Sequence, residues 1–115
     1  MIEQWISDIK RECPPDRLGM ILVHNGIVRA TSKQGKLVAG MKLSYDQAML
    51  DQAVRRFRNM EGIVDIRAWI NEGLLKVGDD IMYVCVAGRF RKDILPVFQE
   101  LITLIKTEIV REEEL

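Results

Sequence analysis

The stretch Ile81-Met-Tyr-Val-Cys-Val-Ala87 runs directly into Gly88-Arg89-Phe90-Arg91-Lys92 and so joins an apolar run to a basic cluster. The apolar run has no polar face, which predicts a strand at the centre of a sheet covered on both sides. Beyond the cluster, apolar residues recur at helical spacing as far as about Val110. They predict a helix that begins at Arg91 or Lys92 and carries Lys106 near its far end.

Two more helices are predicted upstream. Apolar residues on one face predict a helix over residues 2–12, which Cys13-Pro14-Pro15 ends. Ser44-Tyr-Asp-Gln47 has the form of a capping box, with a serine followed three residues later by a glutamine. It predicts the start of a second helix over about residues 45–60, which Gly62 stops.

Strands fill the remaining segments. Residues 18–30 and 37–43 read as strands joined by a polar hairpin loop over 31–36, and 63–71 as a third strand. Residues 74–80 form a short piece with its own turn. The order α-β-β-α-β-β-α predicts an α+β fold in which helices cover a mainly antiparallel sheet. The length of 115 residues predicts one domain over 1–115.

Composition narrows the possible partners. The 17 Lys and Arg balance the 17 Asp and Glu, so we expect no nucleic-acid or membrane partner. No apolar run reaches the roughly 18 residues that span a bilayer, and the N-terminus resembles no signal peptide. Two cysteines, Cys13 and Cys85, and the single His24 supply neither a disulfide framework nor a metal site. We therefore expect a cytoplasmic protein without metal or cofactor, in which Cys85 is a small buried side chain.

Three cations are candidates for binding an anion. Arg29 ends the strand that contains Gly26-Ile-Val-Arg29, and its guanidinium can hold an anion with two parallel hydrogen bonds. Arg91 opens a helix, where free N–H groups also favour anions. Lys106 borders the apolar stripe, and a partly desolvated amine beside arginines can take part in proton transfer. The simpler alternative for each is an ordinary solvated charge.

Taken together, these pieces resemble the large, catalytic subunit of molybdopterin synthase over roughly residues 17–112. The resemblance lies in Gly26-Ile-Val-Arg29 before a polar loop and in Leu43-Ser-Tyr45 before the central helix. It continues in Gly73-Leu-Leu-Lys-Val-Gly-Asp79, in the strand that leads to Arg91, and in Leu104-Ile-Lys106-Thr107. None of these motifs is decisive alone, but their order and distances match.

The resemblance implies an α/β-hammerhead fold and a homodimer that binds a small ubiquitin-like sulfur-carrier subunit. It implies sulfur transfer from the carrier's C-terminal thiocarboxylate to cyclic pyranopterin monophosphate, which makes the dithiolene of molybdopterin. Lys106 would be the catalytic lysine, and Arg29 and Arg91 would bind anions.

This chain departs from the family pattern at several positions. Phe90 stands where the family has a histidine, and Ile70-Asn71 stand where it often has His-Arg. The Pro-x-Trp-Lys-x-Glu segment that carries a second lysine is not matched, and Arg111 is the candidate substitute. Two alternatives remain: a paralogue that binds the carrier without catalysis, and a regulatory domain that binds an anionic metabolite.

Overall fold

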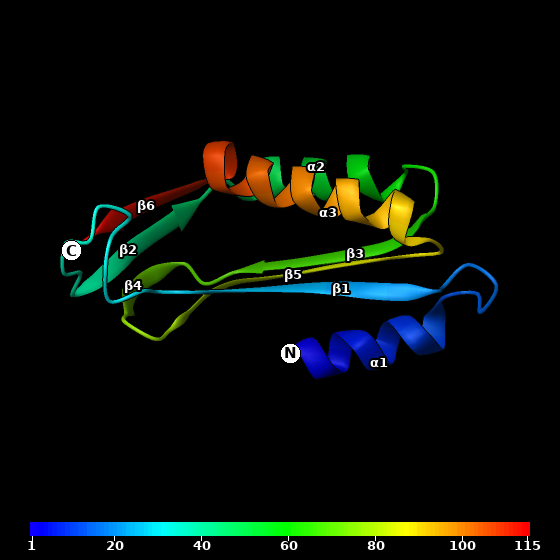
Figure 1. Ribbon diagram of the computed structural model, residues 1–115. Coiled ribbons are helices and arrows are strands. Elements are labelled where there is room, and N and C mark those ends of the chain that lie inside the picture. Colours follow the sequence, from blue (N-terminus) through cyan, green and yellow to red (C-terminus); the bar gives the residue numbers. More distant parts are fainter.

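The structure, a computed structural model, describes residues 1–115 and measures 47 × 24 × 23 Å along its principal axes. Two three-stranded antiparallel sheets lie end to end along the long axis, with helices packed on the first (Figure 1). None of the helices combines the length and the apolar character needed to span a membrane. The helices are α1 (Ile2–Glu12), α2 (Gln47–Arg58) and α3 (Arg91–Leu104), and the strands are β1 (Met20–Ile27), β2 (Gly40–Tyr45), β3 (Ile63–Ile70), β4 (Gly73–Lys76), β5 (Asp80–Gly88) and β6 (Val110–Glu114).

The first sheet has the order β1-β5-β3, so β5 is its central strand. Helices α2 and α3 cover one face, and α1 covers part of the other (Figure 1). Most of β5 is buried, and Cys85 is 0% exposed. The predictions of a central covered strand, a buried Cys85 and an antiparallel α+β fold are confirmed.

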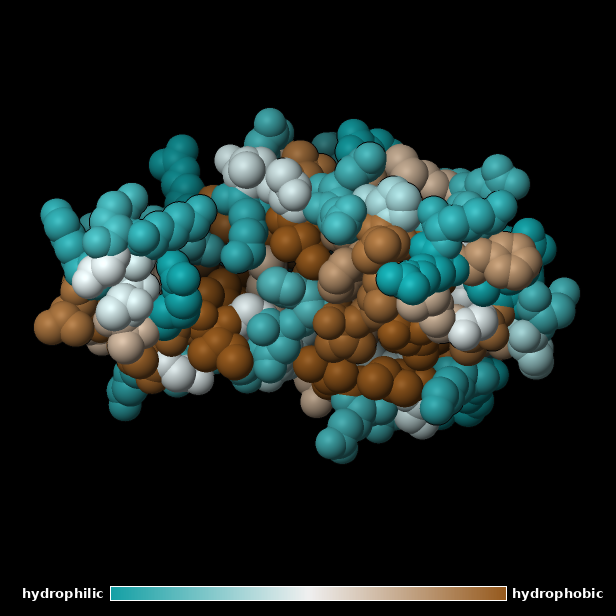
Figure 2. Space-filling model, viewed as in Figure 1, coloured by the Kyte–Doolittle hydropathy of each residue, from teal (hydrophilic) through white to brown (hydrophobic).

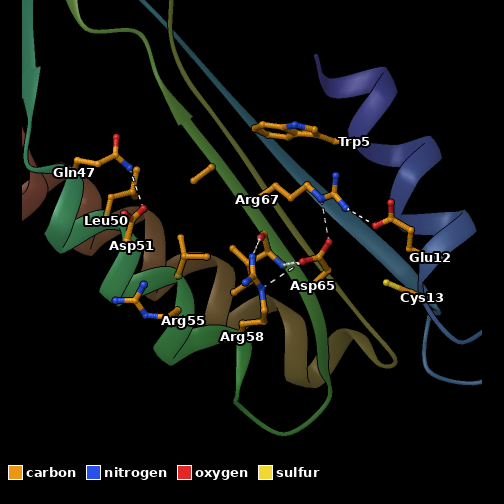
Figure 3. A pocket seen from close by; sticks show the side chains of 13 residues that line it. Trp5, Glu12, Cys13, Gln47, Leu50, Asp51, Arg55, Arg58, Asp65 and Arg67 are labelled. Carbon is orange, nitrogen blue, oxygen red and sulfur yellow. Dashed lines mark hydrogen bonds and ion pairs between the residues drawn. The ribbon is translucent and has the colours of Figure 1, made fainter.

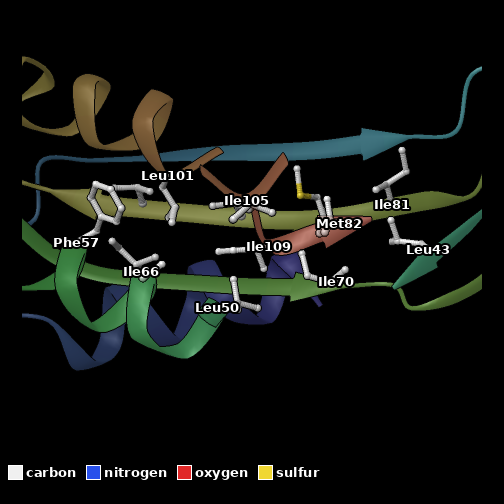
Figure 4. Close-up of a cluster of buried hydrophobic side chains, with 14 of the residues drawn as sticks. Leu43, Leu50, Phe57, Ile66, Ile70, Ile81, Met82, Leu101, Ile105 and Ile109 are labelled. Atoms are coloured by element: carbon white, nitrogen blue, oxygen red, sulfur yellow. The ribbon is translucent and has the colours of Figure 1, made fainter. Parts of the chain in front are cut away.

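The main core lies between this sheet and the two helices α2 and α3. Figure 4 shows Phe57 of α2, Ile66 of β3 and Leu101 of α3 meeting over the sheet, with Leu43 of β2 at the far end of the same cluster. Burying an aliphatic or aromatic side chain of this kind contributes about 1.5–3 kcal/mol. The cluster extends into β2, β4 and β6 and so ties the second sheet to the first.

The predicted hairpin between residues 18–30 and 37–43 is wrong. Strand β1 pairs only with β5, whereas β2 lies in the second sheet, of order β4-β2-β6. The connecting segment keeps one isolated bridge, Thr31 to Leu37. Its polar turn closes locally, but β5 offers β1 a longer and more buried partner than the 37–43 segment could.

The end of the last helix also differs from the prediction. The α-helix stops at Leu104, short of the predicted end near Val110. A π-helical segment covers Ile105–Ile109, and Val110–Glu114 form β6. Strand β6 pairs with β2 from Tyr45↔Val110 to Met41↔Glu114. Burial of Ile105, Ile109 and Val110 anchors this change of direction, and pairing with β2 satisfies the backbone that follows.

The N-cap of helix α2 lies two residues after the predicted cap, Ser44. Asp46 is the N-cap residue, and its carboxylate accepts a hydrogen bond of 3.0 Å from the backbone N–H of Met49. Ser44 instead lies in β2, paired with Arg111. Asp and Ser are comparable caps, so the choice follows from where the strand ends.

Candidate functional site

Arg29 and Lys106 line the same pocket, although 77 positions separate them in the sequence. The pocket has a volume of about 470 Å³ and lies where the end of β1 meets the 31–38 segment, the π-helical segment and β6. Gly26 forms part of its wall, and Lys33 comes from the loop above. Arg29 and Lys106, two of the three predicted cations, therefore line one pocket.

The charges in this pocket are mixed. Arg29, Lys33 and Lys106 face Glu112 and Glu114, which share one face of β6. None of the three cations forms an ion pair within 4.0 Å with a carboxylate of the chain. The cations are therefore open to an anionic ligand, and the two glutamates line the pocket beside them.

The π-helical segment determines where Lys106 points. Ile105 and Ile109, four residues apart, are both buried at 0% and 3% exposure, which leaves Lys106 between them on the exposed side. The hydroxyl of Thr107 donates a hydrogen bond of 2.8 Å to the carbonyl of Thr103. Single π-helical turns are frequent at functional sites because they turn a side chain away from its α-helical direction.

His24 lies behind the pocket wall at Gly26 and is a polar residue that the sequence analysis did not identify as functional. It lies on the face of β1 that packs toward α3, and its ring meets the edge of Phe98 at a centroid distance of 6.5 Å. Burial, and then the nearby Lys106 ammonium, lower the pKa of His24 below its ordinary value of 6.5. The signal was strand alternation, because His24 has the same parity as Leu22 and Gly26 on the inward face.

The other two predicted residues lie elsewhere in the chain. Arg91 is exposed at the first turn of α3, about 20 Å from Lys106 along a helix that rises about 1.5 Å per residue. Arg111 lines a separate hollow with Tyr45 and Glu108, on the face of β6 opposite Glu112. Within one copy of the chain, neither guanidinium joins Arg29 and Lys106.

The loop lysine at the pocket is Lys33. Lys36 and Lys92 are not among the lining residues. Lys92 instead lies at the start of α3, where its ammonium and the guanidinium of Arg89 approach the Phe90 ring at 5.9 Å and 4.6 Å. Phe90 is 48% exposed there.

A larger hollow of about 690 Å³ lies between α1 and α2 beside β3 (Figure 3). Two of the three arginines that line it are already paired: Arg67 contacts Asp65 at 3.0 Å and Glu12 at 3.1 Å, and Arg58 contacts Asp65 at 3.3 Å. An anion would have to displace these carboxylates to reach Arg58 or Arg67, which leaves Arg55 as the one unpaired cation here, against three in the pocket around Lys106. The hollow is therefore a weaker anion site than the smaller pocket around Lys106.

Neither cysteine has the environment of a reactive thiol. Burial raises the pKa of Cys13, which lines the larger hollow, and the Asp65 carboxylate raises it further. Burial raises the pKa of Cys85 to about 11. A thiol is nucleophilic only as the thiolate, so the chain's own sulfur atoms are poorly suited to carry a transferable sulfur.

Comparisons with known proteins identify the family and the fold of the chain. The family described as "MoaE protein" matches residues 2–108. An uncharacterized protein of Methanocaldococcus jannaschii is 27% identical over 94 residues, which cover 78% of this chain and 79% of that protein.

Solved structures share the fold at low identity. Molybdopterin synthase from Staphylococcus aureus has a TM-score of 0.73 at 20% identity, with 85% of this chain and 74% of that chain covered. The complex of subunits 1 and 2 of the molybdopterin-converting factor from Helicobacter pylori gives 0.76 at 15% identity, covering 98% and 74%. Molybdopterin cofactor biosynthesis protein E from Burkholderia multivorans gives 0.75 at 21% identity, covering 99% and 80%. With the family matched over nearly the whole chain, this protein is a divergent member of the MoaE family, the family of the large subunit of molybdopterin synthase.

Proposed function

We propose that this protein acts in molybdenum cofactor biosynthesis as the sulfur-transferring large subunit of a molybdopterin synthase. The donor is the C-terminal thiocarboxylate of a small ubiquitin-like carrier, and the acceptor is cyclic pyranopterin monophosphate. The observation that carries the proposal is the meeting of Arg29 and Lys106 in one pocket of a MoaE-type fold. The similarity to a two-subunit complex from Helicobacter pylori supports a small protein partner.

The residue types suit this chemistry. Phosphate and thiocarboxylate are both anions, and a guanidinium such as that of Arg29 binds oxyanions through two parallel hydrogen bonds. Opening the cyclic phosphate and expelling oxygen require proton transfer, which the amine of Lys106 supplies. Because both thiols of the chain are held protonated, the sulfur comes from outside the chain.

We propose a homodimer as the working form, with Arg91 reaching the pocket of the second copy. Arg91 and Lys106 mark opposite ends of α3, so an antiparallel pair of protomers can bring them together where one copy cannot. Figure 2 shows apolar residues gathered along the middle of one face, bordered by hydrophilic side chains. On β1, Val23 and Ile27 are 38% and 51% exposed and would become buried in such a contact.

The test is reconstitution with purified thiocarboxylated carrier and cyclic pyranopterin monophosphate, with molybdopterin as the measured product. We expect Lys106→Ala to lower the rate by at least about 100-fold, because removal of a general acid or base has effects of this size. Its dimer, measured by light scattering, should persist. Lys10→Ala, on the exposed face of α1, is the matched control and should retain full activity. Full activity in Lys106→Ala would remove this residue from the mechanism.

A second candidate is a paralogue that binds the carrier without catalysis. It is favoured by Phe90, whose exposed ring stands where the family has a histidine, and by the glutamates Glu112 and Glu114 in the anion pocket. The same reconstitution separates the two: this candidate predicts a stable complex with the carrier and no product. A regulatory domain would show neither and would instead be stabilised by an anionic metabolite.

A further inference from the structure

His24 carries a buried polar atom without a partner. Its Nε2 is fully buried and forms no hydrogen bond, and it is the only buried side-chain nitrogen or oxygen atom of the chain in that state. Its cross-strand neighbour Val84 and the packed ring of Phe98 are both apolar. Leaving a buried polar group unpaired costs about 1–3 kcal/mol, and an apolar ring would fill the same space without that cost.

The unpaired atom lies against the wall of the Arg29–Lys106 pocket. A Cβ atom built on Gly26, which lines the pocket, would stand 3.3 Å from His24 Nε2. Lys106 lines the same pocket, and its charge reaches the imidazole, where it disfavours protonation. The unpaired nitrogen and the lysine therefore approach one region from two elements, β1 and the π-helical segment.

The two groups are chemically complementary. The other ring nitrogen of His24, Nδ1, is not among the buried atoms that lack a partner. It can therefore carry the ring proton and donate a hydrogen bond to water. Nε2 is then a lone-pair acceptor, and an ammonium offers three donors and no acceptor. The long side chain of Lys106 can turn its Nζ toward that acceptor.

We propose that His24 is a positioning residue, whose Nε2 accepts a hydrogen bond from Lys106 Nζ and directs the amine into the pocket beside Arg29. This inference rests on the proposed function for its catalytic consequence, although the pairing itself does not depend on sulfur transfer. It assigns to the lone histidine a role that its strand position alone does not suggest. Neutral imidazole suits the role, because a second cation there would repel the ammonium.

Two substitutions separate positioning from packing. His24→Phe keeps a ring against Phe98 and removes the acceptor, whereas His24→Gln keeps an oxygen acceptor at a similar reach. In the reconstituted reaction we expect His24→Phe to lower the rate at saturating substrate by about 10-fold or more with an unchanged or higher Tm. His24→Gln should stay within about threefold of the wild-type rate. A wild-type rate for His24→Phe, or equal losses in both variants, would overturn the proposal.

A spectroscopic measurement tests the pairing without any assay of activity. The chain has one histidine, so its ¹⁵N ring signals need no assignment. At pH 7.5 we expect the tautomer protonated at Nδ1, with an Nε2 signal displaced toward that of a hydrogen-bonded acceptor. Lys106→Met should move that signal to the position of an unbonded nitrogen. A signal that Lys106→Met leaves unchanged would overturn the pairing, whereas an inactive wild-type protein that shows the displacement would overturn the proposed function alone.

Discussion

At the scale of single residues, the two thiols test the proposal that the transferred sulfur comes from outside the chain. Cys13 borders a hollow in which burial and the Asp65 carboxylate both favour the protonated thiol. We therefore expect Cys13→Ser to retain the wild-type rate of molybdopterin formation within about twofold. Cys85 is fully buried beneath α1, where no carrier can reach it, so Cys13 is the one thiol whose role this substitution has to test. A large loss of rate in Cys13→Ser would show that sulfur passes through this residue.

The imidazole of His24 makes stability depend on pH in a definite direction. Its pKa is lowered in the folded protein, so the unfolded chain, with a pKa near 6.5, takes up the proton first as the pH falls. The stability is fully present above pH 6.5 and is lost as the pH falls from there toward the folded-state pKa.

We expect the Tm of the wild type to drop more than that of His24→Phe between pH 7.5 and pH 5.5, by on the order of a degree or two. The lowered carboxyl pKa values of Asp8 and Asp80 are common to both proteins and act at lower pH. Equal drops in Tm would contradict the assignment of a buried neutral imidazole.

Only some of the residues of the site could be predicted from the sequence. The family resemblance selected Arg29 and Lys106, because a cation at a strand end or at a helix border is by itself usually an ordinary solvated charge. His24 was overlooked because a single histidine was considered only as a metal ligand. Strand parity places it on the inward face, but no local pattern shows that Lys106 lies opposite.

At the scale of elements, β5 and α2 were predictable and β6 was not. An apolar run without a polar face and a helical repeat are local signals, and both agree with the packing that stabilises them. The sequence of β6, Val110-Arg-Glu-Glu-Glu114, has low strand propensity and forms a strand only because β2 offers a partner. The predicted hairpin was wrong for the same reason: β1 pairs with β5, which is distant in the sequence, and no local pattern indicates that pairing.

The turn from β5 to α3 depends on a close approach of two backbones, and it places Arg91 at the start of α3. A Cβ atom on Gly88 would lie 2.1 Å from the carbonyl oxygen of Gly62 and 2.8 Å from Cγ1 of Ile94. That oxygen already accepts a hydrogen bond of 3.0 Å from the N–H of Arg89, so it cannot move freely. We expect Gly88→Ala to lower the free energy of unfolding by about 2–4 kcal/mol, measured by urea denaturation.

A second glycine provides the control. Gly35 has a φ of +82° and no atom within 4 Å of a built Cβ, so Gly35→Ala tests backbone conformation alone. We expect it to cost about 1–2 kcal/mol. A cost for Gly88→Ala no larger than that for Gly35→Ala would show that the β5–α3 turn can relax around an added methyl group.

At the scale of the whole molecule, the length of α3 separates the predicted site into two halves. The pocket of one copy contains Arg29 and Lys106, while Arg91 lies about 20 Å away at the other end of the helix. The sequence analysis identified these residues as one set but could not predict which copy's pocket each residue would join. An antiparallel dimer is the simplest assembly that lets an exposed Arg91 complete the pocket of its neighbour.

This arrangement predicts complementation between two inactive variants. Lys106→Ala and Arg91→Ala should each lose most activity as pure proteins, because each dimer then lacks the same group at both pockets. When the two are mixed and allowed to exchange subunits, half of the dimers are mixed, and each of these has one intact pocket. Activity should therefore return to about a quarter of the wild-type value.

Mixing Lys106→Ala with Arg29→Ala is the matched control and should restore nothing, because Arg29 and Lys106 line the same pocket of one copy and no mixed pocket is complete. Recovery in that control, or none with Arg91→Ala, would place Arg91 outside the site of the second copy.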